Sequence, residues 1–424
     1  MSELPIGIRL DRYPDGSEEL AFSVYHSADF ERWSRALLQG HRLGKFHGIR
    51  HLKISFDDSP YRARIHHPMG FFLAELQQAL PNIEGIHLEN TGTFPIRLLT
   101  SLVRITNTLK YIRLEAIILD GNLVDMQELA DALQDQTALQ SFQLQDASFS
   151  HGAFVRSVNL YPIICALSLL PTLERVHIRA FPAQAQNGSA TVGSLGTLAS
   201  TLSQGLGCVT NLSQLKLENF DLKNDHLILL AKGLSSNPSI PLRQVELSSF
   251  TPKTMESPTI VALNNAITAT YNHSSNHHSG ELKLFRLGMI HEQEALLYGL
   301  ATGALMSLAC TLQELDIGSG DHQEDDDNGT MMRDRTTKAV VDMLAHHNTT
   351  LQWIHFPGHY SDSMWMPTIE FYLKLNRSGI RNQLLHLVEN KESSHARKWI
   401  QVLTDISQDL DLVFFWIQAN PWPF

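Results

Sequence analysis

The stretch LSQLKL at residues 212–217 holds the pattern that decides the fold: three apolar residues, separated first by two other residues and then by one. Copies of this pattern recur about every 34 residues between Ile49 and Leu351. A spacing of roughly 20 to 50 residues is typical of stacked-repeat proteins, in which each repeat buries its apolar face against its neighbours. The ten sets are Ile49/Leu52/Ile54, Ile83/Ile86/Leu88, Leu109/Ile112/Leu114, Leu139/Phe142/Leu144, Leu173/Val176/Ile178, Leu212/Leu215/Leu217, Leu242/Val245/Leu247, Leu282/Phe285/Leu287, Leu312/Leu315/Ile317 and Leu351/Ile354/Phe356.

Each copy predicts a strand that is followed by a helix. The last two apolar residues lie two positions apart, as Leu215 and Leu217 do, which is the spacing of one face of a β-strand. The next segment changes to helical spacing, so that residues 123–136 carry Leu123, Met126, Leu129, Ala130 and Leu133 on one face. We therefore predict an α/β solenoid of about ten irregular repeats, an arc or horseshoe with a parallel inner sheet and outer helices.

Composition narrows the class of protein. The 424 residues are 43% hydrophobic, which suffices for the continuous core of a solenoid. A formal net charge of −11 disfavours nonspecific binding to nucleic acid, because no overall positive field attracts phosphate. The sequence shows neither a signal peptide nor 18 uninterrupted apolar residues. We expect a monomer of the cytoplasm, with the nucleus as an alternative, that binds neither nucleic acid nor membrane.

The repeats resemble the leucine-rich repeat family of the ribonuclease-inhibitor-like type over about residues 46–360. That resemblance implies a helix on the convex side of every repeat. The family usually places Asn or Cys three residues after the third apolar position, whereas this chain has Asp57, Thr91, Ile117, Ala147, Phe181, Phe220, Phe250, Ile290, Gly320 and His359 there. We therefore expect no asparagine ladder. The block IEFYLKLNR at 369–377, followed by Gly379, is similar to the ending of a group of leucine-rich repeat proteins from diatoms.

Both ends of the chain differ from the repeats. Residues 1–46 alternate on both sides of a Pro-Asp-Gly turn, which predicts a β-hairpin, and then predict a helix with Phe30, Trp33 and Leu37 on one side. We interpret this segment as an N-terminal cap, because a solenoid must cover the exposed ends of its stack. The repeats then occupy residues 47–360.

Residues 361–424 predict a helical C-terminal cap whose first helix begins near Pro367. The chain then runs into an aromatic segment with Phe414, Phe415, Trp416 and Trp422. Acidic flanks oppose binding to anionic lipid. We interpret this segment as packing on the last repeat rather than as a membrane anchor.

Motifs for catalysis and metal binding are incomplete in this sequence. There is no nucleophile elbow, Walker A loop or dinucleotide fingerprint. The segment from His291 to Ala295 begins like the helix of a zinc protease but has alanine where the second histidine is needed. The acidic run at 321–329 is followed by Arg335 at the position where a calcium loop needs glutamate. His277 and His278 lie in a polar loop, and Cys165, Cys208 and Cys310 are too widely spaced for a disulfide framework. We expect no enzyme activity, no metal and no cofactor.

The predicted concave face carries the candidate binding site. The residue between the last two apolar positions of each repeat points onto this face, and seven of these ten residues are Lys, Arg or His. We predict that this column and its neighbours bind a partner protein with an acidic or phosphorylated surface. The candidate residues are Lys53, His87, Tyr111, Arg113, Arg175, His177, Arg179, Lys216, Arg286, Trp353 and His355. The alternative is an ordinary polar face on which Glu89, Glu115 and Glu218 neutralise much of the charge.

A non-enzymatic scaffold for protein–protein interaction is the function that these features favour, since the solenoid offers a large curved surface. The resemblance implies two alternatives. A substrate receptor of a ubiquitin ligase would need an adaptor-binding helical module before the repeats. A leucine-rich GTPase-activating protein would use an exposed arginine on the phosphate, but the acidic run at 321–329 is shorter than the tail expected of that class.

Overall fold

The protein has an α/β fold in which a mostly parallel sheet is covered by helices. The computed structural model describes residues 8–14, 16–24, 28–42, 46, 48–56, 72, 75–76, 78–80, 82–151, 154–156, 161–180, 211–218, 223–236, 241–248, 255–272, 282–288, 293–307, 310–318, 327–356, 360 and 363–379. The strands are β1 (Ile8–Arg12), β2 (Glu18–Val24), β3 (Ile49–Phe56), β4 (Gly85–Pro95), β5 (Tyr111–Asp120), β6 (Ser141–His151), β7 (Phe154–Arg156), β8 (Arg175–Ala180), β9 (Gln214–Glu218), β10 (Gln244–Ser248), β11 (Leu284–Leu287), β12 (Glu314–Asp316) and β13 (Trp353–His355). The helices are α1 (Ala28–Arg42), α3 (Ile96–Val103), α4 (Leu123–Gln134), α5 (Tyr161–Ser168), α7 (Asn224–Ser236), α8 (Ser257–Asn272), α9 (Gln293–Ala301), the 3-10 turn η2 (Ala304–Met306), α10 (Asp327–His346) and α11 (Met366–Ser378).

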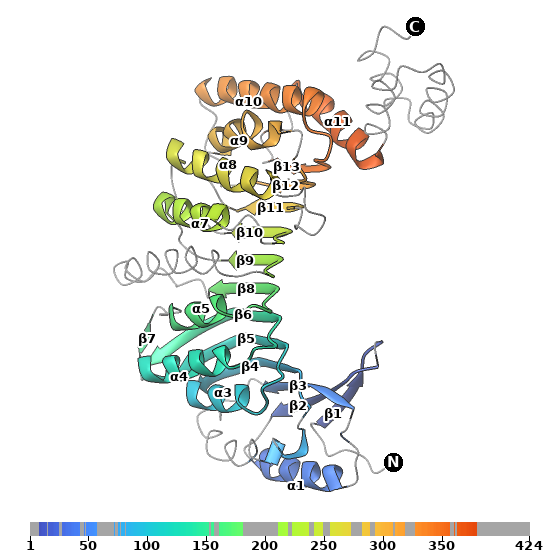
Figure 1. Cartoon of the computed structure of the whole chain (residues 1–424), viewed down its shortest axis with the longest axis vertical. Coiled ribbons are helices and arrows are strands. Elements are labelled where there is room, and N and C mark those ends of the chain that lie inside the picture. The colour runs from blue at the N-terminus through green and yellow to red at the C-terminus, as the bar shows by residue number, and fades with distance from the viewer. Residues whose placement is uncertain are drawn as a thin grey trace, which may run out of the picture.

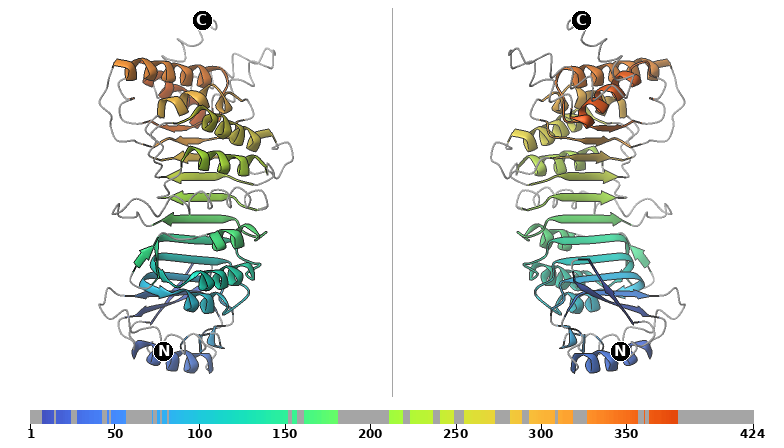
Figure 2. Two further views of the ribbon diagram at one scale, coloured as in Figure 1. Left: turned by 90° about the vertical axis from the view of Figure 1, so that its left-hand side faces the viewer. Right: turned by 90° about the vertical axis from the view of Figure 1, so that its right-hand side faces the viewer.

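The sheet follows the order of the chain, as expected when each repeat adds one strand. Its thirteen described strands run from β1 to β13 in sequence, except that β7 leaves this path and pairs antiparallel with β6. From β2 to β13 the remaining pairs are parallel. Helices α3 to α10 lie along one face of the sheet (Figure 1), and the strands are stacked from one end of the molecule to the other (Figure 2). We call the opposite side, which none of the helices from α3 to α10 covers, the helix-free face.

The apolar pattern builds the core as predicted. In the first nine sets every anchor residue is at most 7% exposed. In the tenth set Leu351 is fully buried, whereas Ile354 and Phe356 are only partly buried. β13 is the last of the described strands in the sheet, so none of them covers these two residues on that side.

The ends of the stack contain the expected elements. β1 and β2 form an antiparallel hairpin, and Trp33 and Leu37 of α1 are buried. β2 also pairs in parallel with β3, so the sheet begins within the first 46 residues. α11 begins beside Pro367 as predicted, and its Ile369 packs into the core. The segment from residue 380 onward, including Phe414, Phe415, Trp416 and Trp422, lies outside the described residues, as do His277, His278, His291, Cys208 and residues 321–326.

Threonine hydroxyls join neighbouring repeats at the turns that precede the strands. Each Oγ1 donates to the carbonyl of the first apolar residue of the preceding repeat. The four bonds are Thr108 to Ile83 at 3.4 Å, Thr172 to Leu139 at 2.9 Å, Thr311 to Leu282 at 3.2 Å and Thr350 to Leu312 at 3.1 Å. These bonds satisfy backbone carbonyls between repeats, which is the task that an asparagine ladder would perform after the strand.

Two details depart from the sequence-based picture of the repeats. Leu123 was expected on the buried face of α4, but it is 62% exposed because it is the first residue of the helix. β4, β5 and β6 each span ten or eleven residues, and Ala116 within β5 has a positive φ of 50°. The strands of the first repeats therefore continue past the last apolar anchor instead of ending there.

Replacement of the central anchor Leu215 by aspartate should destabilise several repeats together. Leu215 is 2% exposed, and a buried unpaired charge adds to the lost packing, so we expect a loss of at least about 3 kcal/mol. Gln214→Asp is the matched control, because that neighbouring side chain is exposed. Chemical denaturation followed by circular dichroism measures both. Equal stability of the two variants would contradict the proposed core.

Candidate functional site

The helix-free face consists of three columns of side chains that run across the strands. The central column lies between the buried anchors, and the pairing of the strands aligns it in the predicted register. It contains Lys53, His87, Arg113, Gln143, His177, Lys216, Glu246, Arg286, Asp316 and His355. The first column lies two residues earlier on each strand and includes Tyr111, Ser141, Arg175, Gln214 and Trp353. The third column lies two residues later and includes Glu89, Glu115, Gln145, Arg179 and Glu218.

Ion pairs neutralise the cations near the N-terminal end of this face. Lys53 Nζ lies 2.5 Å from Glu89 Oε2. Arg113 donates to Glu115 Oε2 through Nε at 3.0 Å and Nη2 at 2.6 Å. His87 lies between the two cations, and burial, reinforced by both positive charges, lowers its pKa below the usual 6.5. We call these five residues the N-terminal network.

A second group of ion pairs surrounds Arg286. Its Nε lies 2.7 Å from Asp316 Oδ2, its Nη1 lies 3.3 Å from Glu246 Oε2, and its Nη2 lies 3.3 Å from Glu314 Oε1. Lys216 Nζ approaches the same Glu246 oxygen at 3.2 Å. One guanidinium on β11 thus bonds to carboxylates on the two flanking strands, β10 and β12, which connects side chains of all three strands.

Glu218 extends this group toward the middle of the sheet. It accepts bonds from His177 Nε2 at 2.7 Å and Arg179 Nε at 2.8 Å, and Lys216 Nζ lies 3.1 Å away. Burial alone would raise the pKa of Glu218, but the hydrogen bonds from these three groups lower it to about 2. We call the residues bonded around Glu218, Glu246 and Arg286 the C-terminal network.

His177 is neutral in this arrangement. The amide nitrogen of Gln145 lies 3.0 Å from His177 Nδ1 and can only donate, so Nδ1 accepts and Nε2 donates to Glu218. Burial lowers the pKa of His177 below its usual value, although the bond to Glu218 acts in the opposite direction. The histidine therefore adds hydrogen bonds rather than positive charge to the face near neutral pH.

β6 separates the two networks. Its side chains in the three columns are Ser141, Gln143 and Gln145, which carry no charge. Next to it on β8, Arg175 is exposed and makes no ion pair with the carboxylates of the described residues. Arg175 is therefore an exposed cation at the middle of this face that contacts no carboxylate of the described residues.

The C-terminal end of the face carries an exposed aromatic side chain. Trp353 is 48% exposed, and the guanidinium of Arg377 from α11 lies 3.9 Å from its ring centroid. His355, two residues later on β13, lies 3.4 Å from Glu314 through Nε2. The contact between Arg377 and Trp353 is a cation–π interaction that holds one side of the indole in place.

The structure brings the predicted residues onto one face, but most of their positive charge is neutralised there by carboxylates. Sequence reasoning described the central column as a basic strip, whereas Lys53, Arg113, Lys216 and Arg286 each contact a carboxylate. The alternative of neutralisation by Glu89, Glu115 and Glu218 describes the charge correctly. Of the candidate residues that stay exposed, Tyr111, Arg175 and Trp353 lie in the first column, and Arg113 and His355 lie in the central column.

An aromatic group beside Tyr111 was missed from the sequence. The His51 ring lies 6.1 Å from the Tyr111 ring and 5.7 Å from the Tyr13 ring. Gly85 stands between His51 and Tyr111 in the ladder, and a Cβ there would lie 2.5 Å from His51 Nδ1, so the glycine makes room for the imidazole. The position of His51 two residues before the central column was the signal that could have revealed it.

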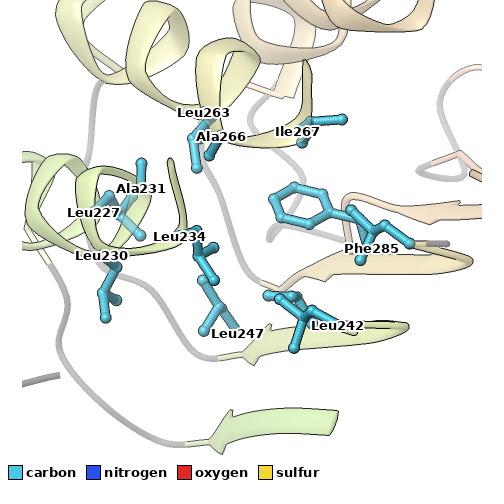
Figure 3. A pocket seen from close by; sticks show the side chains of 12 residues that line it. Leu227, Leu230, Ala231, Leu234, Leu242, Leu247, Leu263, Ala266, Ile267 and Phe285 are labelled. Carbon is cyan, nitrogen blue, oxygen red and sulfur yellow. The ribbon is translucent and has the colours of Figure 1, made fainter. Parts of the chain in front are cut away.

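The interior offers one small apolar gap between α7, α8, β10 and β11. Leu227, Leu230 and Leu234 of α7 face Phe285 and Leu247 across it (Figure 3). Its volume of about 10 Å³ is at the lower limit for a single water, and its lining is apolar. We interpret it as a packing gap of the core and not as a ligand site.

Neither metal-binding groups nor spanning helices occur in the part of the chain that the structure describes. No three His, Cys, Asp or Glu side chains there are placed to hold a metal ion. None of the helices described is both long and apolar enough to cross a membrane. In comparisons with known proteins, no family model matches the chain and no match was found among curated protein sequences.

The lowered pKa values of His87 and His177 predict a loss of stability in mild acid. The unfolded chain binds these protons more strongly than the folded one, so stability is full above about pH 6.5 and declines as the pH falls below it. Glu218 adds a separate loss only as the pH falls below about 4.5.

Thermal unfolding between pH 7.5 and 5 measures this effect. We expect the melting temperature of His87→Gln/His177→Gln to fall less over this range than that of the wild type. His346→Gln is the control, because this histidine is exposed at the end of α10, and it should keep the wild-type slope. Identical slopes for all three proteins would refute the assignment.

Proposed function

We propose that this protein is a leucine-rich repeat scaffold of the ribonuclease-inhibitor-like type, without enzyme activity, that binds a partner protein on its helix-free face. The observation that carries the proposal is the combination of exposed Tyr111, Arg175 and Trp353 on one side of a continuous sheet. Tyr, Trp and Arg are the residues most enriched among those that dominate binding energy at protein interfaces. They lie on an extended surface, as binding residues do in solenoid proteins.

The ion-pair networks support a binding role for the same face. Side chains that are already held by two or three neighbours, as Arg286 and Glu218 are, lose little conformational freedom when a partner covers them. Their carboxylates and cations bond to one another. We therefore propose that the ion-paired side chains form a rigid polar surface, and that the exposed residues of the first column provide the contacts to the partner.

A triple variant tests the proposed surface. Tyr111→Ala/Trp353→Ala/His355→Ala removes three exposed side chains of the helix-free face and should reduce partner binding at least tenfold, with the fold unchanged by circular dichroism. The control, Leu123→Ala/Val124→Ala/Val261→Ala, removes three exposed apolar side chains from α4 and α8.

Partners are captured from cell extract by the wild-type protein, identified by mass spectrometry, and then purified for titration against all three proteins. The proposal requires a purified partner that binds the control like the wild type and the triple variant more weakly. Equal binding to the triple variant would contradict the proposed surface. Weaker binding only to the control would place the interface on the helices instead.

A further inference from the structure

Beside β6, the helix-free face carries an exposed arginine that contacts no carboxylate of the described residues, Arg175 on β8. β5 contributes Glu115 and β9 contributes Glu218, and both carboxylates are bonded to cations. β6, between them, carries Ser141, Gln143 and Gln145 in the three columns. Arg175 on β8 pairs in the ladder with Ser141 on one side and Gln214 on the other, so neither neighbour in its column carries a charge.

No carboxylate of the nearby network is free to turn toward Arg175. Glu218 is bonded by His177, Arg179 and Lys216. Glu246, one strand further, contacts Lys216 and Arg286. Movement of either carboxylate toward Arg175 would break these bonds, which are charge-assisted and stronger than ordinary hydrogen bonds.

Tyr111 forms the apolar side of the same patch. It is 39% exposed, and its two neighbours in the first column, Gly85 and Ser141, are small and buried. Two strand spacings of about 4.8 Å each separate Tyr111 from Arg175, with Ser141 between them. The Tyr111 ring and the Arg175 guanidinium therefore lie on either side of the small residue Ser141, and their backbones are roughly 10 Å apart.

We propose that the patch of Tyr111, Ser141, Gln143, Arg175 and Gln214 binds a Glu or Asp side chain in an acidic segment of the partner protein. The carboxylate pairs with Arg175, the amides of Gln143 and Gln214 can donate to it, and its methylene groups pack against the Tyr111 ring. This inference rests on the proposed function and names the chemistry of the partner at one place on that surface.

A carboxylate suits this patch better than a phosphoryl group does. Arg175 supplies one positive charge that contacts no carboxylate of the described residues, which matches a single carboxylate. A phosphoryl group carries nearly two negative charges near pH 7 and needs further cations. The nearest candidate, Lys216, already contacts Glu218 and Glu246 and would have to leave them. The partner predicted here is therefore acidic but not phosphorylated.

A display library of random 12-residue peptides, selected on the full-length protein, tests the inference. We expect the enriched peptides to share a Glu or Asp whose replacement by Gln or Asn weakens binding at least tenfold. Arg175→Gln should bind these peptides at least tenfold more weakly and should no longer distinguish the acid from its amide. Arg243→Gln is the matched control, because Arg243 is exposed on the turn before β10, and it should behave as the wild type.

Arg175→Lys keeps the charge and should retain the preference for the acid, which separates loss of charge from loss of fold. An empty selection, enriched peptides that do not depend on an acid, or a preference that survives Arg175→Gln would overturn the inference. Tighter, Arg175-dependent binding of phosphoserine in place of the acid would overturn the choice of carboxylate. Partner binding that is lost in the Tyr111/Trp353/His355 variant but not in Arg175→Gln would leave the proposed function standing without this inference.

Discussion

Burial of three apolar residues per repeat against the repeats on either side is the constraint on which the structure depends. A single strand and helix cannot cover Leu212, Leu215 and Leu217, but the strands before and after them can. A full burial of one aliphatic side chain contributes about 1.5–3 kcal/mol, so these contacts offset much of the entropy lost when a repeat becomes ordered. The parallel register follows from this burial, because a shift by one residue would expose every anchor.

The same register organises the polar side of the sheet. Once Leu215 and Leu217 point toward the helices, Lys216 must point away, and it meets His177 and Glu246 in its column. Charged residues that are far apart in the chain thus become neighbours about 4.8 Å apart. They form two separate networks because β6 carries amides and a hydroxyl where the adjacent strands carry charges. Arg175 lies at this boundary between the two networks, and this position is the reason for proposing a binding patch there.

Periodicity was a reliable guide wherever burial alone decides the position of a residue. It predicted the strands, the helix around Met126, the hairpin before residue 25 and the membership of the central column. It failed where partners decide the outcome. The central column appeared basic because the sequence pattern does not show that Glu115 and Glu218 of the third column form ion pairs with cations of this face. Leu123 fitted the apolar face of α4 but lies at the first residue of that helix, where it is exposed.

The sequence by itself determined the repeat, its alternation of strand and helix, and which side chains share the helix-free face, because a period of two on a strand and 3.6 on a helix separates the buried residues from the exposed ones. Only the tertiary structure decided which of those side chains neutralise one another and which remain available. The stacking of Arg377 on Trp353 and the pairing of His177 with Glu218 join residues 24 and 41 positions apart. Such contacts depend on the side-chain conformations of several repeats at once, and no local pattern encodes them.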